Sequence, residues 1–321
     1  MSERTRAIAI MNPNTGRLPS DKVAWFLGKM LEQTYDVEFR FSTFAGEERD
    51  LAEIAADEAD LVIAVGGDGT VAHVAAGIMG KNVDMAILPN GSTNVVARGL
   101  GIPGDPFRAA RALQREMEPR WIDVGVSGDR IILHMAGSGL DSLMFRDTKP
   151  ELKRFFAWLA YVPPALKHLR TRPWKFKLTI DGETLETEAR MVLVANGAFV
   201  VNPRFKVGKD IKIDDGYLDL LVFRPPNIAA SLSLAGWIAL GRPHRSRHVY
   251  QTKAKSFNVD STPPAPVEFD GDYVGVTPFE VTVSPRALHI MTPVDRPGTR
   301  KWNGPTYSDM GSLSNTQRGP Y

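Results

Sequence analysis

The sequence contains no cysteine. This absence excludes disulfide bonds, catalytic thiolates and zinc sites with cysteine ligands, and it fits a protein of the reducing cytoplasm. The six histidines show no metal-ligand spacing and no Ser/His/Asp order stands out. Neither a zinc enzyme nor a triad hydrolase is therefore predicted.

An excess of charge of one sign is also missing. Lys and Arg number 39, and Asp and Glu number 37. The chain therefore lacks the strong positive field that proteins binding nucleic acid carry, and we expect no nucleic-acid partner.

No apolar run is long enough to cross a membrane. The longest candidate, Ile228 to Leu240, has 13 residues, whereas a hydrocarbon core requires ~20. The polar start Met1 to Arg6 leads into a short strand-like run rather than into a signal peptide. We expect a cytoplasmic protein whose contact with any membrane is peripheral.

The patterns that are present divide the chain in two. A length of 321 residues exceeds the size at which one hydrophobic core keeps growing, which favours two domains. In the first part, apolar runs alternate with helical patterns, as in a parallel α/β sheet covered on both faces. The expected strands are Ala7–Met11, Val37–Phe41, Leu61–Val65 and Met85–Leu88, and the expected helices are Asp21–Thr34, Glu47–Glu58 and Val71–Met79.

The second part is rich in strand patterns and in Gly or Pro turns, which indicates an all-β, largely antiparallel domain. Asp181-Gly182 suits a type I′ hairpin, and helical stretches interrupt the strands near Phe155–Leu169 and Ile228–Leu240. We place the domains at residues 1–124 and 125–295, followed by a disordered tail at 296–321. The expected strands are Ile131–Ala136, Lys175–Ile180, Ala189–Asn196, Tyr217–Phe223, Val249–Val259, Val267–Phe269 and Phe279–Val283.

The segment Gly66-Gly67-Asp68-Gly69-Thr70 carries the first functional signal. It follows the apolar run Leu61–Val65 and precedes a helical pattern. Glycines let the backbone approach a ligand, and the amides at a helix start attract anions such as a phosphate chain. An ordinary strand-to-helix turn also uses Gly and Asp. The position at the carboxyl end of a buried strand favours ligand binding.

Two more loops occupy equivalent positions in the predicted sheet. Asn12-Pro13-Asn14-Thr15-Gly16 follows the first strand, and Leu88-Pro89-Asn90-Gly91-Ser92-Thr93-Asn94 follows the last of the parallel strands. Three such strand-end loops predict one polar crevice lined by glycine. The pattern is neither a P-loop nor the dinucleotide-binding fingerprint.

These loops, with Asp214-Asp215-Gly216 and Asp270-Gly271-Asp272, resemble in sequence and order the diacylglycerol kinase catalytic-domain family. That family includes bacterial soluble diacylglycerol kinases and the sphingosine and ceramide kinases. The resemblance covers Arg6 to Pro293. Gly-Gly-Asp-Gly is shared with NAD kinases and phosphofructokinases, whereas the Leu-Pro-Asn-Gly-Ser-Thr-Asn loop and the later Asp-Asp-Gly element are typical of the lipid kinases.

The resemblance implies an ATP-binding N-terminal α/β domain, a C-terminal β-sandwich-like domain and an active site in the cleft between them. It implies magnesium ligands at the Asp215 side chain and at the backbone oxygens of Lys212 and Tyr217. The glutamate base of the family maps onto Asp272, and Asp68 is the second candidate catalytic residue. The nucleotide contacts implied are Asn12, Pro13, Asn14, Thr15, Gly16, Thr43, Gly66, Gly67, Asp68, Gly69, Thr70, Gly91 and Ser92.

Phosphoryl transfer suits these residue types. It needs phosphate positioning, a hard cation and a carboxylate that orients or deprotonates the attacking hydroxyl. Two positions depart from the family. Val95 stands where many bacterial relatives carry an aspartate in a water network to magnesium, and Asp272 is one methylene shorter than glutamate, which shifts its reach by ~1.5 Å. Asp270 is a rival for the role of base.

The sequence gives weaker signals for the binding of a lipid or a membrane. Lys153 to Lys177 interleaves aromatic and basic residues, which fits either an anionic membrane interface or a helix with a buried aromatic face. Gly137-Ser138-Gly139-Leu140-Asp141 matches a Gly-rich element of the family that faces the cleft, and a plain bulge or turn is its alternative.

The leading hypothesis is a kinase that uses ATP and Mg²⁺ to phosphorylate a hydroxyl of diacylglycerol or a related lipid alcohol. An NAD kinase is the alternative enzyme, and the loop Leu88 to Asn94 argues against it. A catalytically weak protein that binds nucleotide or lipid is the alternative from another class, kept open by Val95 and Asp272. The expected partners are the lipid substrate and an anionic membrane surface, and a homodimer stays an option.

Overall fold

The computed structural model describes residues 4–16, 19–147, 171–199, 203 and 205–294. The expected helical stretch Phe155–Leu169, most of Lys153 to Lys177 and the tail from residue 296 lie outside these residues.

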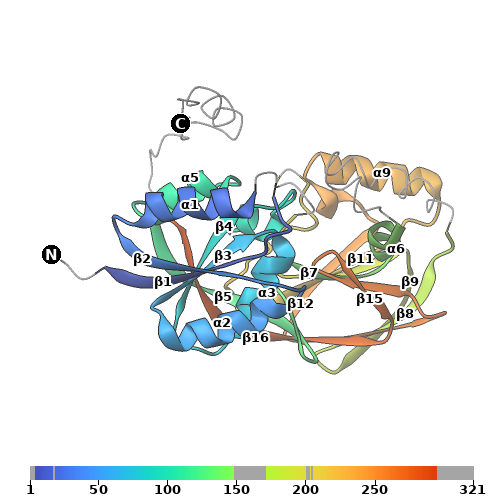
Figure 1. Ribbon diagram of the computed structural model, residues 1–321. Coiled ribbons are helices and arrows are strands. Elements are labelled where there is room, and N and C mark those ends of the chain that lie inside the picture. Colours follow the sequence, from blue (N-terminus) through green and yellow to red (C-terminus); the bar gives the residue numbers. More distant parts are fainter. Residues whose placement is uncertain (1–3, 17–18, 148–170, 200–202, 204, 295–321) are drawn as a thin grey trace.

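The N-terminal part is a parallel sheet with helices on both faces (Figure 1). Its strands lie in the order β2-β1-β3-β4, so the winding direction reverses between β1 and β3. Open α/β sheets bind ligands beyond the carboxyl ends of their strands at such a switch point. The elements are β1 (Thr5–Met11), α1 (Ser20–Leu31), β2 (Tyr35–Phe41), α2 (Glu47–Glu58), β3 (Leu61–Gly66), α3 (Asp68–Ile78), β4 (Asp84–Pro89), α4 (Val95–Gly99) and α5 (Pro106–Leu113).

Burial explains why these strands read as continuous apolar runs. All six residues of β3 are buried, because α1 and α5 cover one face of the sheet and α2 and α3 the other (Figure 1). Ile8, Ile63 and Ile87 lie in the resulting core. The expected parallel α/β fold of this part is confirmed.

The second part consists of two antiparallel layers packed face to face. One contains β16, β13, β8 and β9 with β5 and β6 and continues the parallel sheet through the pairing of β16 with β4, and the other is a separate sheet of order β12-β11-β10-β7-β14-β15. Phe176, Phe257 and Leu220 fill the core between them, which confirms the expected β-sandwich-like fold. The elements are β5 (Met117–Ser127), β6 (Arg130–Ile132), β7 (Met135–Gly139), α6 (Leu140–Asp147), β8 (Trp174–Ile180), β9 (Glu183–Ala189), β10 (Met191–Ala195), β11 (Leu218–Phe223), α9 (Ile228–Ala239), the 3-10 helix Pro243–Arg245, β12 (Val249–Ala254), β13 (Ser256–Thr262), β14 (Pro266–Phe269), β15 (Asp272–Val276) and β16 (Phe279–Pro293).

One long strand joins the two parts. β16 begins beside β13 in the sandwich and ends in parallel register with β4, where Ile290 pairs with Met85. Leu288 and Ile290 lie in the N-terminal core. The end of the described chain therefore returns to the first sheet, and the division near residue 124 stays a prediction.

Two segments expected as single strands are each divided in two. Asp270 accepts hydrogen bonds from the amides of residues 133–135, which separates β6 from β7 within Ile131–Ala136. Asp181 accepts from Lys255 N and Ser256 N, and the break between β12 and β13 falls there. Asp181 and Gly182 have φ of 45° and 93°, as the expected type I′ turn requires.

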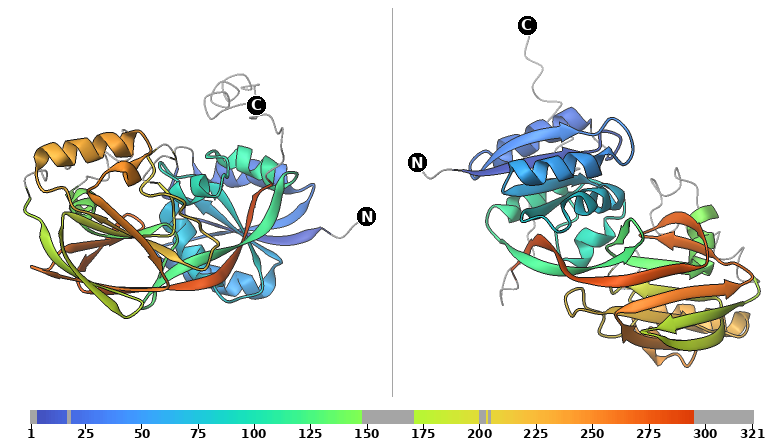
Figure 2. Two further views of the ribbon diagram at one scale, coloured as in Figure 1. Left: turned by 180° about the vertical axis from the view of Figure 1, so that it is seen from behind. Right: turned by 90° about the horizontal axis from the view of Figure 1, so that it is seen from below.

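Helix α9 lies on the outer face of the second sheet (Figures 1 and 2). Its Leu234 and Ile238 pack on that sheet in a small cluster with Leu221 and Phe223. Among the described residues, no helix has both the length and the apolar composition needed to span a membrane.

Candidate active site

The three predicted loops meet at the switch point of the parallel sheet. Asn90, in the loop after β4, donates from its backbone to Gly66 O at 2.8 Å and from its side chain to Thr15 O at 3.3 Å. Gly16 has φ of +95°, and a Cβ there would lie 2.4 Å from Asn90 Nδ2. One asparagine therefore ties the loops after β1 and β3 together, and glycine is required where the chains approach.

The second and third loops also approach closely at two glycines. A Cβ on Gly91 would lie 2.6 Å from the Cα of Gly67. The side chain of Asn94, whose φ is 50°, accepts from Gly91 N at 3.0 Å and donates to Gly91 O at 2.9 Å. The loop is thus fixed by its own amide, and Ser92 is exposed at its tip.

The first loop is a short self-bonded turn. Asn12 Oδ1 accepts from Asn14 N at 2.9 Å, and Asn12 O accepts from Thr15 Oγ1 at 2.8 Å. Pro13 lies between them and is exposed. Thr43, in the loop after β2, donates from Oγ1 to Glu47 Oε2 at 2.8 Å.

Asp68 stands at the start of α3 and holds the next helix. Gly67 occupies the N-cap without a side-chain hydrogen bond, which leaves the amides of the first turn to an anionic ligand. Asp68 Oδ1 accepts from Val96 N, in the first turn of α4, at 3.1 Å. Val95 packs against the N-terminal core, so the residue that departs from the family serves packing.

Glu48 organises the rear of the crevice, and sequence reasoning missed it. Its side chain is 1% exposed, and it accepts from Asn12 Nδ2, Ser42 Oγ and Gly46 N at 2.8 to 3.0 Å and lies 3.1 Å from His73 Nδ1. Burial acts to raise the pKa of Glu48, but hydrogen bonds from its own backbone amide, Ser42 and Asn12 hold it below the usual value. An ionised glutamate therefore links the first loop to α2 and α3.

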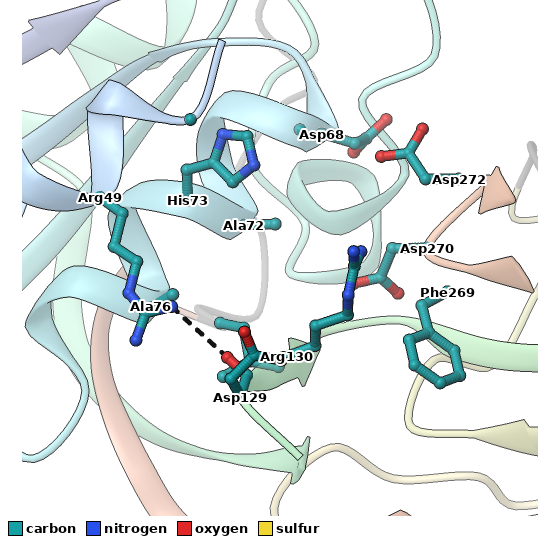
Figure 3. Close-up of a pocket in the computed structure, with 13 residues that line it drawn as sticks. Arg49, Asp68, Ala72, His73, Ala76, Asp129, Arg130, Phe269, Asp270 and Asp272 are labelled. Atoms are coloured by element: carbon teal, nitrogen blue, oxygen red, sulfur yellow. Dashed lines mark hydrogen bonds between the residues drawn. The ribbon is translucent and has the colours of Figure 1, made fainter. Parts of the chain in front are cut away.

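A pocket of about 300 Å³ opens between the two parts of the molecule (Figure 3). Asp68, at the start of α3, and Asp272, at the start of β15, direct their carboxylates toward one another across it (Figure 3). The structure thus brings together the two candidate catalytic residues, which lie far apart in the sequence. The pocket is lined by Gly46, Arg49, Asp68, Gly69, Ala72, His73, Ala76, Asp129, Arg130, Ile131, Phe269, Asp270 and Asp272.

Two aspartates of one turn play different parts. Asp270 accepts three backbone hydrogen bonds, from Leu133 N, His134 N and Met135 N, at 2.8 to 2.9 Å. Burial raises the pKa of Asp270 to about 6 against the effect of these bonds. Asp272 is exposed to the pocket. Asp270 anchors the turn, and Asp272 is the carboxylate that it presents.

A buried carboxyl pair lies behind the turn, and sequence reasoning missed this too. Glu268 Oε2 accepts from Gly271 N at 2.6 Å, while Glu268 Oε1 and Asp141 Oδ2 both lie in the space that a Cβ on Gly137 would need. Burial raises the pKa of Asp141 to about 7, and burial together with the Asp141 charge raises that of Glu268 well above its usual value. The pair therefore holds a proton, and the Gly-rich element 137–141 makes room for it rather than lining the pocket.

The predicted magnesium ligands lie elsewhere. Asp215 does not line the pocket. Its Oδ1 accepts from Tyr217 N at 3.2 Å, and its Oδ2 forms an ion pair with Lys253, which also lies 3.5 Å from Asp219 Oδ2. No group of three or more His, Cys, Asp or Glu side chains in the described chain could hold a metal. In this arrangement the Lys253 ammonium lies at the Asp215 carboxylate, and a magnesium ion held by Asp215, Lys212 and Tyr217 stays a prediction.

Cationic side chains also line the pocket. Arg49 comes from α2 and donates to Asp129 O at 3.4 Å, and Arg130 comes from β6 and extends toward Asp270 (Figure 3). His73 of α3 lies between Arg49 and Asp68 in the view of Figure 3. The sequence does not predict that these basic residues meet at one pocket, because their meeting depends on how the β5–β6 hairpin packs against α3.

Comparisons with known proteins agree on one family. Residues 6–126 match the family model described as "Diacylglycerol kinase catalytic domain", and residues 135–292 match "YegS C-terminal NAD kinase beta sandwich-like domain". A protein named diacylglycerol kinase from Bacillus subtilis is 29% identical over 91% of this chain and 97% of its own length. A protein named "Probable lipid kinase YegS-like" from Chromohalobacter salexigens is 32% identical over 67% of this chain and 70% of its own length.

A solved structure shares the fold. The crystal structure of a diacylglycerol kinase from Bacillus anthracis str. Sterne superposes with a TM-score of 0.71, covering 91% of this chain and 98% of that one. At 22% sequence identity this likeness concerns the fold, including the way in which the sandwich follows the parallel sheet.

Proposed function

The chain belongs to the diacylglycerol kinase catalytic-domain family of lipid kinases, and on that premise we propose that it transfers the terminal phosphoryl group of ATP to a hydroxyl of diacylglycerol or a related lipid alcohol. Residues 1–124 would bind the nucleotide, and residues 125–295 would bind the lipid. The reaction would take place in the pocket between them, at a membrane surface that the protein contacts peripherally.

The observation that carries this proposal is the meeting of Asp68 and Asp272 across the pocket (Figure 3). Asp68 lies at the start of the helix that follows the Gly-lined crevice, where backbone amides are suited to phosphate. Asp272 approaches from the sandwich. Phosphoryl transfer requires that a phosphate chain and an acceptor hydroxyl be held in line, and a pocket between two separately built walls supports that geometry.

The transfer would proceed as follows. The lipid hydroxyl oxygen forms a bond to the terminal phosphorus of ATP, and the bond from that phosphorus to the bridging oxygen breaks, which releases ADP. Asp272 accepts the hydroxyl proton, so charge and atoms balance. The loop residues Asn12 to Gly16, Thr43, Gly66 to Thr70, Gly91 and Ser92 would hold the nucleotide, and Arg130 would offset the negative charge on the transferred group.

Magnesium would enter with the nucleotide. Asp68, on the nucleotide side of the pocket, is a hard oxygen donor, and one or two carboxylates with substrate phosphates are the usual protein surroundings of this ion. When bound there it would neutralise phosphate charge. No step of the proposed reaction depends on a cation at Asp215, whose carboxylate is paired with Lys253.

The test is transfer of label from radiolabelled ATP to a panel of lipid alcohols, with NAD as the competing acceptor. We expect an organic-phase phosphorylated product from at least one lipid and none from NAD. Label on NAD would overturn the proposal in favour of an NAD kinase. Binding of ATP without label on any acceptor would identify a catalytically weak nucleotide-binding protein.

A further inference from the structure

Helix α9 (Ile228–Ala239) is a surface helix with an apolar outer face. It contains no charged residue. Leu232 is 58% exposed, the adjoining Leu240 is 70% exposed and Ile228 is 40% exposed. A surface helix ordinarily turns a polar or charged side to water, and one that is apolar all round is normally buried. An exposed apolar surface of this kind marks a site of interaction.

Helix α9 is capped at both ends and packs on the second sheet. Asn227 Oδ1 accepts from Ala230 N at 2.9 Å as the N-cap, and Gly241, with φ of +67°, follows its C-terminus as helix-ending glycines do. Leu234 is the one buried residue of α9, and it packs on the second sheet with Ile238 beside it. The remaining apolar residues therefore contribute nothing to that core. They are exposed although the helix itself is capped and packed in place.

A basic flank follows the apolar face. Arg242, Arg245 and Arg247 are exposed, in and around the 3-10 helix Pro243–Arg245. Between Leu220 and Gln251 the sequence contains four Arg residues and no Lys, Asp or Glu. The whole chain has nearly equal numbers of acidic and basic residues. This stretch therefore carries a local excess of positive charge, next to the apolar helix α9.

We propose that α9 and its basic flank dock on the surface of an anionic lipid bilayer, with Leu232 and Leu240 entering the interface and the three arginines contacting headgroups. This assignment rests on the proposed function, since a lipid substrate resides in such a bilayer. An apolar face without charge and an adjacent cluster of cations are the two components that bind a helix in the plane of an anionic interface. Docking would occur through the sandwich, the part proposed to take the lipid.

Other occupants fit less well. A second copy of this chain would bring two clusters of arginine together, because a symmetric contact places like surfaces against one another. The charge complementarity therefore favours an anionic surface over self-association. The segment Lys153 to Lys177, the other basic and aromatic stretch of the sequence, is a competing membrane contact that the experiment must separate from α9.

The experiment is co-sedimentation of the full chain with lipid vesicles in the absence of nucleotide. Wild type should bind vesicles of phosphatidylcholine with phosphatidylglycerol, bind pure phosphatidylcholine weakly, and lose binding as salt rises. The variant Leu232→Ser/Leu240→Ser should bind about tenfold more weakly at every salt concentration. The variant Arg242→Gln/Arg245→Gln/Arg247→Gln should lose about 10- to 100-fold and bind both vesicle types equally.

The matched control is Ile54→Ser. Ile54 is 54% exposed on α2, which lies on the opposite side of the molecule from α9 (Figures 1 and 2). The Ile54→Ser variant should bind vesicles as wild type does. All variants should keep the circular dichroism of wild type and its turnover of a water-soluble short-chain lipid alcohol, since none alters the pocket.

Three results would overturn the proposal. The leucine and arginine variants could bind like wild type, which would assign docking to Lys153 to Lys177. Wild type could fail to distinguish anionic from neutral vesicles. Wild type could sediment as a dimer that the leucine variant converts to a monomer, which would assign α9 to self-association. Because vesicle binding is measured without ATP, a failure of kinase activity would leave the docking result standing, and the two proposals fail separately.

Discussion

The two walls of the pocket are built by different means. The parallel-sheet side is shaped by close approaches of the chain in the crevice loops, with Gly16 and Gly91 placed where a side chain would collide. The sandwich wall is shaped by carboxyl groups, with Asp270 and Glu268 each accepting from backbone amides. Backbone and glycine leave amides free for phosphate, whereas buried carboxyls fix a turn so that one exposed carboxylate is aimed.

Because of this contrast, mutations on the first side should affect chemistry, whereas most mutations on the second should affect folding. On the first wall, a substitution changes the space and donors that a nucleotide meets. On the second wall, Asp270 and Glu268 hold the chain through backbone amides, and Asp272 is the most exposed acid of the turn.

Asp68→Ala should have the largest effect, a loss of turnover of about 10³ or more, because it removes one of the two carboxylates that meet in the pocket. It should also cost about 1 kcal/mol of stability through the lost bond to Val96 N. Steady-state kinetics and urea unfolding measure the two effects. Asp105→Ala is the matched control, since Asp105 caps α5 through Phe107 N and Arg108 N outside the pocket. The Asp105→Ala variant should lose a similar stability and keep the kcat of wild type. If Asp68→Ala had the same kcat as Asp105→Ala, Asp68 would take no part in the reaction.

Asp270→Asn should lower the free energy of unfolding by about 2–3 kcal/mol, because a buried carboxylate that accepts three amides becomes an amide with one acceptor. Asn tolerates the φ of 50° at this position, so backbone strain does not contribute. Denaturant unfolding of this variant beside Asp272→Asn measures the contrast. Asp272→Asn should remain within about 0.5 kcal/mol of wild type, and a larger loss there than at Asp270 would reverse the roles assigned to the two aspartates.

Gly91→Ala should weaken ATP binding about tenfold, because the new Cβ would lie 2.6 Å from the Cα of Gly67 and backbone cannot yield as a flexible side chain can. Equilibrium binding of ATP reports it. Gly104→Ala is the control, since nothing lies within 4 Å of its Cβ position. Unchanged affinity in Gly91→Ala would show that the glycine contact does not shape the nucleotide site.

The pH dependence of stability should reveal the buried pair of Asp141 and Glu268. The pKa of Asp141 is raised from 3.8 to about 7, so between these values the folded pair retains a proton that the unfolded chain has released. Its contribution to stability is full below the lower value and falls as pH rises, by ~1 kcal/mol per pH unit. Glu268→Gln keeps an acceptor for Gly271 N and removes the shared proton. The stability of this variant relative to wild type should therefore increase as pH rises from 5 to 7. Parallel profiles of the two proteins in thermal unfolding would contradict a shared proton.

Periodicity and strand-end loops predicted much of this molecule. The helix Glu47–Glu58 has its expected bounds, because its apolar stripe faces a buried sheet. The three loops could be placed at one crevice because the carboxyl ends of parallel strands share an edge. Asp68 and Asp272 meet there, as the resemblance to lipid kinases implied, although the roles of the individual loop residues stay predictions.

What the sequence did not indicate depends on contacts between distant residues. Asp270 divides Ile131–Ala136 by binding amides more than 130 positions away, and no local pattern contains that bond. Glu48 and Glu268 are buried acids in segments that look like an ordinary helix start and an ordinary strand. For Glu268 the one signal was its position between Val267 and Phe269 in an apolar run, where an acid needs a partner.

The central claim is that the two walls meet in one reaction, with Asp272 as the base that the sandwich presents to the nucleotide side. The most direct measurement is single-turnover transfer of phosphate from ATP to the lipid alcohol by Asp272→Asn, with the dissociation constant of ATP determined on the same protein. The account predicts a rate lower by about 10²–10⁴ with ATP affinity unchanged, and substantial recovery in Asp272→Glu. A transfer rate close to that of wild type in Asp272→Asn would contradict it.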